Sequence, residues 1–365
     1  MSKEYTGPVR IKDIAKKAGV STGTVDRVLH GRGKVSPEKE RKVREAIALL
    51  EYKPNMMARS LAMKSGFHIA VIMPNYEKDS FWRSQLNGIQ KANKYIKDFG
   101  FSIQVLGFND QKHGDLLKHR EYLSTEKIDA LLLAPTISDD ADELLNLCDD
   151  LNIPYLLVNS NLIRENENYL GYIGQDSFQS GVLGAKLLSL MTGKKCSVGV
   201  FHMEKVVENS QHILQKQKGF LSFFKNKQDL KTEVVIDRIP ASMSKKSLRK
   251  SVKDFLNNNP KTKGIFVTTS RIHYLVDVLN SLKIDDITIV GFDLIKENVM
   301  ALEKYERMIL INQNPELQAY NGLMSLFEYL LSKKTISLKQ YLPLDVVTKE
   351  NVSAYIETDS IKHMF

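Results

Sequence analysis

Cysteine, tryptophan and long apolar runs are scarce in this sequence of 365 residues. Its two cysteines, Cys148 and Cys196, lie in segments that read as a helix and the start of a strand. We therefore expect reduced, packed thiols and no disulfide framework. No apolar run reaches the roughly 18 residues that are needed to span a bilayer. Residues 1–10 lack the apolar core of a signal peptide, so we expect a cytoplasmic protein with no membrane partner.

The motifs of the common enzyme classes are also missing. A dinucleotide-binding enzyme needs G-x-G-x-x-G after its first strand, whereas the segment after the first predicted strand, residues 74–82, reads PNYEKDSFW. The sequence has no P-loop, and no Ser-His-Asp or nucleophile-elbow pattern presents itself. A zinc site would need more histidine and cysteine ligands than the chain groups together. We therefore expect no catalytic residue, no metal and no cofactor.

Basic residues are concentrated at one end of the chain. Residues 1–66 carry 15 Lys and Arg against 7 Asp and Glu, a net charge of +8, whereas the rest of the chain carries 37 against 36. This distribution is the electrostatic footprint of a module that binds nucleic acid phosphates. The length of the chain and its 42% hydrophobic content favour two or three domains with a sizeable core.

Residues 11–30 read as two short helices joined by a tight turn. The first has the i, i+3, i+4, i+7 stripe of a helix that buries one face, at Ile11, Ile14, Ala15 and Ala18. Gly19 stands where a helix end favours positive φ, and Ser21 stands where the next helix favours an N-cap. The second helix turns Val25, Val28 and Leu29 inward. This spacing is typical of a helix-turn-helix, although a purely structural helical hairpin would share the same stripe.

The exposed face of the second helix carries short polar or cationic side chains, which suit a helix in a major groove: Thr22, Gly23, Thr24, Arg27 and His30. Arg32 and Lys34, in the glycine-containing loop that follows, are placed to reach phosphates. A third helix from Pro37 to near Tyr52 completes a small domain. Residues 53–66 then predict a short helix that would be unstable alone. It is either an incidental linker or a hinge helix that folds on the minor groove of DNA.

From residue 67 the pattern changes to alternating strands and helices. The predicted strands are residues 67–73, 102–108, 129–134, 153–158, 197–201, 233–238, 264–268 and 287–292. Regular alternation of this kind predicts an α/β fold with two doubly wound parallel-sheet lobes. Because ligands bind beyond the carboxyl ends of such strands, we expect the functional residues in the segments that follow each strand.

Residues 9–66 closely resemble the N-terminus of the lac-repressor (LacI/GalR) family of bacterial transcription regulators. The remainder, through the segments IGQDSFQSG, QKQKGF, IVGFD and INQNP, resembles the family's effector domain, which is similar to periplasmic ribose-binding proteins (periplasmic binding protein type I). The resemblance implies a helix-turn-helix domain at residues 1–53, a hinge helix at 54–66 and an effector-binding and dimerisation domain at 67–365. In that last domain, lobe 1 would span about 67–173 and 313–340, and lobe 2 about 174–312 and 341–365.

The resemblance also implies partners and a mechanism. The protein would be a homodimer, possibly a tetramer, that binds pseudo-palindromic double-stranded operator DNA and responds to a small molecule between its lobes. Leu61 matches the family's minor-groove wedge. The residues assigned to DNA contact are Thr22, Gly23, Thr24, Arg27, His30, Arg32, Lys34, Asn55, Arg59 and Leu61. Asp26 stands where serine is usual, so the operator sequence of a relative does not transfer to this chain.

Nine residues match effector-binding positions of the family: Asp79, Phe81, Trp82, Asn159, Lys216, Thr269, Arg271, Asp293 and Gln313. An aromatic pair, Phe81 and Trp82, ringed by acids, amides and cations suits a polyhydroxylated ligand. The alternative for this pair is a place in the core, and Asp176 and Asp293 have an alternative as helix caps. Asn159, Lys216 and Thr269 replace the aspartate, arginine and asparagine that are common in relatives, so no particular sugar is implied.

We therefore expect a DNA-binding transcription regulator, most simply a repressor, that is controlled by a sugar or sugar derivative. A purine co-repressor is the alternative effector, because the same aromatic pair would stack a nucleobase. A solute-binding protein is the alternative from a different class. It would explain the two lobes but would need export.

Overall fold

The computed structural model describes residues 9–30, 33–50, 52, 66–77, 79–162, 164–205 and 207–356. The chain divides into two compact units, residues 1–66 with 327–335 and residues 67–326 with 336–365. Most of the predicted hinge lies outside the described residues. So do four residues assigned to DNA contact, Arg32, Asn55, Arg59 and Leu61, and the side chain of His30.

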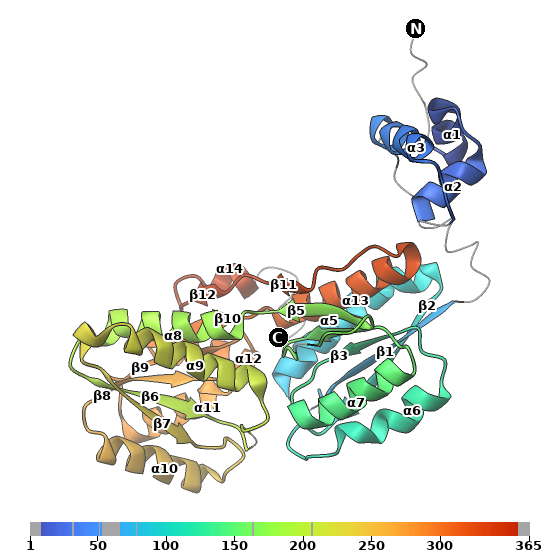
Figure 1. The fold of residues 1–365 in the computed structure, drawn as a ribbon. Helices are drawn as coiled ribbons and strands as arrows, with labels where there is room; N and C mark the ends of the chain where they lie inside the picture. The colour runs from blue at the N-terminus through green and yellow to red at the C-terminus, as the bar shows by residue number, and fades with distance from the viewer. Residues whose placement is uncertain are drawn as a thin grey trace. The chain divides into compact units, whose positions relative to one another are not determined.

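Within residues 9–52, the described part of the chain's N-terminal segment holds three helices: α1 (Ile11–Ala18), α2 (Thr22–His30) and α3 (Pro37–Leu49) (Figure 1). Their buried faces meet in a small apolar core of Ile14, Ala15, Ala18, Val25, Val43 and Ala46. The turn between α1 and α2 depends on Gly19, whose φ of 66° is favourable for glycine and costly for other residues. The predicted helix-turn-helix arrangement is confirmed.

The first lobe is built on a six-stranded parallel sheet. Its strands are β1 (Phe67–Pro74), β2 (Phe101–Phe108), β3 (Ala130–Leu133), β4 (Tyr155–Val158), β5 (Tyr169–Gly174) and β11 (Lys339–Tyr341), in the order β11-β5-β4-β3-β1-β2. The helical segments are α5 (Ser80–Ile96), η1 (Lys97–Phe99), η2 (Leu116–His119), α6 (Arg120–Thr125), α7 (Ser138–Asp150) and α13 (Pro315–Ser332). Helices α5 and α13 pack closely, because a Cβ at Gly88 would lie 2.1 Å from the Glu316 carbonyl oxygen.

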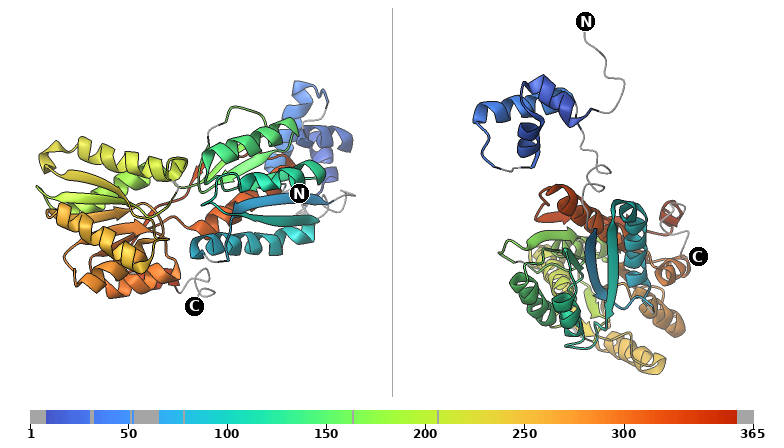
Figure 2. Two further views of the ribbon diagram at one scale, coloured as in Figure 1. Left: turned by 90° about the horizontal axis from the view of Figure 1, so that it is seen from below. Right: turned by 90° about the vertical axis from the view of Figure 1, so that its right-hand side faces the viewer.

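The second lobe repeats this plan with strands β6 (Ser197–His202), β7 (Glu233–Arg238), β8 (Thr262–Val267), β9 (Thr288–Phe292), β10 (Met308–Asn312) and β12 (Asp345–Val347). Their order is β12-β10-β9-β8-β6-β7, and only β12 pairs antiparallel. Its helical segments are α8 (Ser177–Thr192), α9 (Gln211–Lys225), η3 (Gln228–Leu230), α10 (Lys245–Asn258), α11 (Ile272–Leu282), α12 (Lys296–Lys304) and α14 (Val352–Ile356). Figure 2 shows helices on both faces of each sheet.

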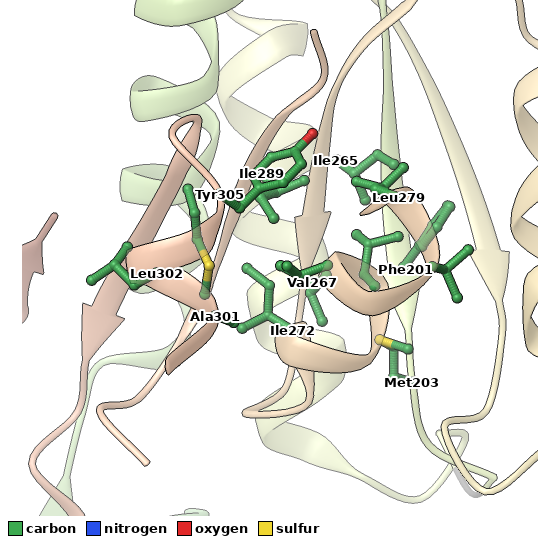
Figure 3. Close-up of a cluster of buried hydrophobic side chains, with 14 of the residues drawn as sticks. Phe201, Met203, Ile265, Val267, Ile272, Leu279, Ile289, Ala301, Leu302 and Tyr305 are labelled. Atoms are coloured by element: carbon green, nitrogen blue, oxygen red, sulfur yellow. The ribbon is translucent and has the colours of Figure 1, made fainter. Parts of the chain in front are cut away.

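Buried apolar side chains fill the space between the second sheet and its helices. Figure 3 shows one such cluster, in which Phe201, Ile265 and Ile289 from three neighbouring strands meet side chains of α11 and α12. A second cluster, with Phe220 stacked on Phe266 at 4.8 Å, packs α8 and α9 on the other face. The prediction of two parallel-sheet lobes is therefore confirmed.

The chain crosses between the two sheets three times. It leaves the first sheet at the end of β5, returns between β10 and α13, and passes again from β11 to β12. Four strands, β5, β10, β11 and β12, were not among the eight predicted from the sequence. Since the carboxyl ends of the other strands of both sheets face the region of these crossings, the fold places the segments that follow them around one interlobe cleft.

Candidate functional site

The exposed face of α2 carries most of the described residues that were assigned to DNA contact. Ser21 caps this helix, since its Oγ accepts a hydrogen bond from the Thr24 backbone N–H at 3.1 Å. Thr22, Gly23 and Arg27 are exposed, and Thr24 is half-buried with its hydroxyl 3.0 Å from Ser21 Oγ. Lys34 is exposed beyond the end of the helix. A capped helix with short side chains on its open face has the shape that a major groove accepts.

A cavity of about 120 Å³ lies between the two lobes of the second unit. A buried water needs about 10–15 Å³ of such space, so the cavity has room for on the order of ten waters or one small organic molecule. Eight of the nine residues predicted to bind an effector line it: Asp79, Phe81, Trp82, Asn159, Lys216, Thr269, Arg271 and Gln313. Asp293 lies directly behind this wall. We call this space the cleft cavity.

The two aromatic residues enter the cleft cavity from the first turn of α5. Their rings meet edge to face with centroids 4.9 Å apart, and each residue is almost completely buried. Asp79 fixes this turn, because its Oδ1 accepts from the backbone N–H groups of Phe81 and Trp82 at 2.9 and 3.4 Å. The pair therefore lines the cavity and is at the same time part of the buried core of the lobe.

An ionic cluster spans the cleft at Arg271. In the second lobe its Nε donates to Glu204 Oε1 at 2.6 Å, and across the cleft its Nη2 donates to Asp79 Oδ2 at 3.2 Å. Gln111, from the first lobe, donates to Glu204 Oε2 at 3.2 Å and to Asp110 Oδ1 at 3.3 Å. Two carboxylates therefore bond one guanidinium, Gln111 links Asp110 to the same cluster, and hydrogen bonds join the lobes at this edge of the cavity.

This arrangement leaves the cluster with an excess of acid. Burial raises the pKa of Asp110, and the neighbouring carboxylate of Asp79 raises it further. Burial likewise raises the pKa of Glu204, against the lowering effect of Arg271. Burial alone would lower the pKa of Arg271, but Glu204 and Asp79 outweigh it and raise that pKa. The cluster is thus a place where a further negative charge would be disfavoured.

A second polar group lies deeper, where Lys216 is 2% exposed. Its Nζ donates to the Thr268 carbonyl oxygen at 3.1 Å and lies 3.6 Å from the centroid of the Phe292 ring. Burial lowers the pKa of Lys216 to about 7, although Asp293 opposes the shift. Asp293 accepts from Ser270 Oγ and Gln313 Nε2, both at 2.6 Å, and burial raises its pKa. These bonds hold Gln313 in the cavity wall.

One residue of this wall and one directly behind it adopt the left-handed backbone conformation that is uncommon outside glycine. Asn159, after β4, has a φ of 64°, and Asp293, after β9, has a φ of 69°. Asn and Asp tolerate this region better than other non-glycine residues. The predicted alternative for Asp293 as a helix cap is wrong, because Ile295 is the N-cap of α12. The same alternative is right for Asp176, whose Oδ1 accepts from the Gln179 N–H at the start of α8.

Four polar atoms in the cavity wall are buried and have no hydrogen-bond partner among the described residues. They are Thr136 Oγ1, His212 Nδ1, Thr269 Oγ1 and Gln313 Oε1. His212 is neutral near pH 7, since burial and then Lys216 lower its pKa to about 3. Buried polar groups are nearly always satisfied, so these atoms mark positions that a polar ligand or water would fill.

The sequence analysis missed several lining residues. Asp110 and Gln111 come just after a predicted strand, as does Glu204, so a systematic use of the strand-end rule would have found them. His212 and Ser210 precede or begin α9, and Glu297 begins α12, where no strand ends. The interlobe bonds beside them, from Ser138 N–H and Oγ to the Asn209 carbonyl oxygen at 2.9 Å, carry no signal in the sequence.

Comparison with known proteins assigns both units. Residues 10–55 match the model of the bacterial regulatory proteins of the lacI family, and residues 69–334 match that of the periplasmic binding protein domain. The chain belongs to the lacI family of bacterial regulatory proteins. It is accordingly a DNA-binding transcription regulator, and no helix in its described part is long and apolar enough to cross a membrane.

Two of its relatives match most of the chain. The ribose operon repressor of Lactococcus lactis subsp. lactis is 25% identical over 350 residues, which are 94% of this chain and 97% of that protein. The sucrose operon repressor of the same subspecies is 27% identical over 286 residues, 78% of this chain and 83% of the relative. A crystal structure assigned as a LacI transcriptional regulator from Bacteroides fragilis has a TM-score of 0.73 at 23% identity, covering 80% of this lacI-family chain and all of that one.

Proposed function

We propose that this lacI-family protein is a repressor whose affinity for a pseudo-palindromic operator is set by a neutral sugar in the cleft cavity. The observation that carries the proposal is the set of buried, unpartnered polar atoms in the cavity wall, next to an aromatic pair. Hydroxyl groups of a sugar would donate to Gln313 Oε1 and bond with Thr136, Thr269 and His212, while a C–H face packs on an aromatic ring. Two curated relatives are named as repressors of sugar operons.

Charge narrows the class of sugar. Asp79, Asp110, Glu204 and Glu297 line the cleft cavity, against the cations of Arg271 and Lys216. Lys216 already has a carbonyl oxygen and a nearby carboxylate as partners. A phosphate or carboxylate group would therefore enter a buried site with an excess of negative charge, where repulsion is weakly screened. We propose an unphosphorylated, non-acidic sugar.

Regulation would follow from the position of the ligand between the lobes. A ligand that contacts both lobes has a different affinity for open and closed arrangements, and it shifts their populations by that difference. We propose that two chains pair, possibly as a dimer of dimers, in the cytoplasm, and present two copies of α2 to successive major grooves. We further propose that the cavity performs no catalysis. A purine effector is the second candidate, because Phe81 and Trp82 offer aromatic surface.

The test measures the unfolding temperature of the full chain with neutral sugars, amino sugars, sugar phosphates, uronic acids and purines, since a ligand of the folded state raises that temperature. We expect stabilisation by one or more neutral sugars and none by their phosphates. Thr269→Val should weaken this binding at least tenfold, because it removes a ligand-facing hydroxyl while it keeps the shape of the side chain. It should not lower stability, since the hydroxyl has no partner in the protein.

Thr288→Val is the matched control. Thr288 is also buried and its Oγ1 also lacks a partner among the described residues, but it lies at the start of β9 and does not line the cleft cavity. Sugar binding in this variant should equal that of the wild type. Stabilisation by a purine and by no sugar would replace the sugar with the second candidate. Equal binding by Thr269→Val and the wild type would remove the cavity from the proposal.

A further inference from the structure

A second cavity, of about 440 Å³, lies beside the crossings between the lobes. Its wall includes Gln175 and Asp176 at the first crossing and Tyr341 just before the last one. We call it the hinge cavity. Asp142 and Asn161 reach it from the first lobe, and Gln211, His212 and Gln215 reach it from α9 of the second. A molecule in this space would therefore contact both lobes, close to the segments about which they move.

Gln175 gives the hinge cavity an unsatisfied polar group. This residue is 2% exposed, and neither its Nε2 nor its Oε1 has a hydrogen-bond partner among the described residues. The side chain thus offers one donor and one acceptor at the same place. A buried amide without partners is costly, and a bound molecule with hydroxyl groups would satisfy both atoms.

The charges of the hinge cavity nearly cancel. Asp142 is paired with Arg164 at 2.9 Å, and Asp176 uses one oxygen to cap α8. Lys339, the first residue of β11, supplies a cation to the wall of the hinge cavity. Tyr341 is 49% exposed and meets the buried Tyr172 edge to face at 6.3 Å, so an aromatic surface is open to a ligand. This combination favours a neutral molecule with several hydroxyl groups, in contrast to an anion or a polycation.

His212 belongs to both cavities. It lines the cleft cavity and the hinge cavity, and its Nδ1 is buried without a partner in the described part of the chain. The same imidazole forms part of the wall of both cavities. A ligand that holds this ring in one orientation from one cavity therefore changes the contacts that the ring offers to a ligand in the other cavity. Contacts with both lobes give a second, independent route by which the two cavities would be coupled.

We propose that the hinge cavity is a second small-molecule site, which binds a neutral, hydroxyl-rich ligand through Gln175, His212 and the Tyr341 ring. Its occupancy alters the affinity of the cleft cavity for its own ligand. The binding itself stands on the hinge cavity alone, whereas the coupling rests on the proposed sugar site in the cleft.

The experiment uses the single tryptophan of the chain, Trp82, which lines the cleft cavity. The full chain labelled with 5-fluorotryptophan gives one ¹⁹F resonance for that cavity, and Tyr341→Trp adds a second at the hinge cavity. Sucrose, D-glucose and myo-inositol are titrated as probes. We expect at least one of them to shift the added resonance saturably, and Thr269→Val in the same protein to leave that shift in place.

Gln175→Leu in the Tyr341→Trp protein should weaken the response of the added resonance at least tenfold while the Trp82 response is retained. The matched control is Gln179→Leu, four residues further on, where the side chain is exposed and lines neither cavity. Folding should survive Gln175→Leu, because the change removes an unsatisfied amide. Calorimetry of the unlabelled wild-type chain provides a check that the reporter did not create the site.

The two proposals fail in different ways. If no probe moves the added resonance while a sugar moves that of Trp82, the hinge site is overturned and the cleft effector stands. If a probe moves only the added resonance, the hinge site stands and the cleft effector fails. Coupling requires that a saturating hinge ligand changes the affinity of the cleft by at least threefold, and an unchanged affinity would refute it.

Discussion

Lys216 illustrates what a single buried charge does in this protein. The ammonium group is held by one carbonyl oxygen and one aromatic face, and Asp293 is the nearby charge that opposes the lowering of its pKa. In the unfolded chain the same group would titrate near its ordinary pKa of 10.5. Between these two values the unfolded state binds a proton that the folded state releases. Stability therefore rises with pH in this window and is lost as the pH falls towards about 7.

We subtract the free energy of unfolding of Lys216→Met from that of the wild type. We predict that this difference becomes more positive from pH 7 to pH 9, by at most about 1.4 kcal/mol for each pH unit. Urea denaturation at pH 7, 8 and 9 measures it, and the subtraction cancels groups that titrate equally in both proteins. A difference that stays constant over this range would show that Lys216 keeps its proton in the folded state.

At the scale of elements, helices α8 and α9 meet with almost no space between their backbones. A Cβ at Gly181 would lie 1.9 Å from the Lys216 carbonyl oxygen, and a Cβ at Gly219 would lie 1.9 Å from that of Phe178. The two glycines are thus reciprocal, one on each helix, and they set the position of α9. Since α9 carries Lys216 and His212, this contact determines where both side chains stand in the cleft.

We predict that Gly219→Ala lowers the free energy of unfolding by at least about 2 kcal/mol, because the added methyl group meets a backbone atom that cannot turn away. Thermal unfolding should show a decrease of several degrees. Lys218→Ala, at the adjacent exposed position, is the control and should change little. An unfolding temperature of Gly219→Ala equal to that of the control would mean that α8 and α9 move apart without a loss of folding stability.

The elements also show how far the sequence leads. Eight strands with apolar, β-rich segments were predicted, whereas β11 and β12 have three residues each and β11 is mostly exposed, so no hydrophobic pattern distinguishes them. Strand β5 contains two glycines, which weaken the strand signal. Strand-end residues such as Thr269 and Arg271 were found because they match effector-binding positions of the family. His212 was missed because its place in the wall depends on the crossing of α8 and α9, which is a tertiary contact.

At the scale of the whole molecule, charge is segregated by function. The N-terminal 66 residues hold nearly all of the basic excess, and the remainder of the chain is almost neutral. Each phosphate contact releases counterions, so the affinity of such a module for DNA falls steeply with salt. The nearly neutral remainder of the chain would add little to this salt dependence. The salt dependence of DNA binding should therefore come from individual cations of the N-terminal 66 residues.

We predict that Arg27→Ala weakens binding to an operator selected from random sequences by about tenfold and lowers the slope of log affinity against log salt by about 0.9, the loss of one phosphate contact. Arg41→Ala, in an exposed ion pair with Glu45 on α3, is the matched control and should retain both values. Gel-shift titrations at several salt concentrations measure them. Equal losses in both variants would mean that overall charge, and not the face of α2, binds the operator.

The left-handed residues of the cleft have a consequence for how new specificities arise. Asn159 and Asp293 stand at positions where a branched or bulky side chain would be strained whatever ligand it favoured. Mutational drift at these two sites is therefore restricted almost entirely to glycine, asparagine and aspartate. Thr269 has no such positive φ, so random mutagenesis that seeks a response to a new ligand should accumulate its productive changes there, while Asn159 and Asp293 remain nearly invariant across the selected clones.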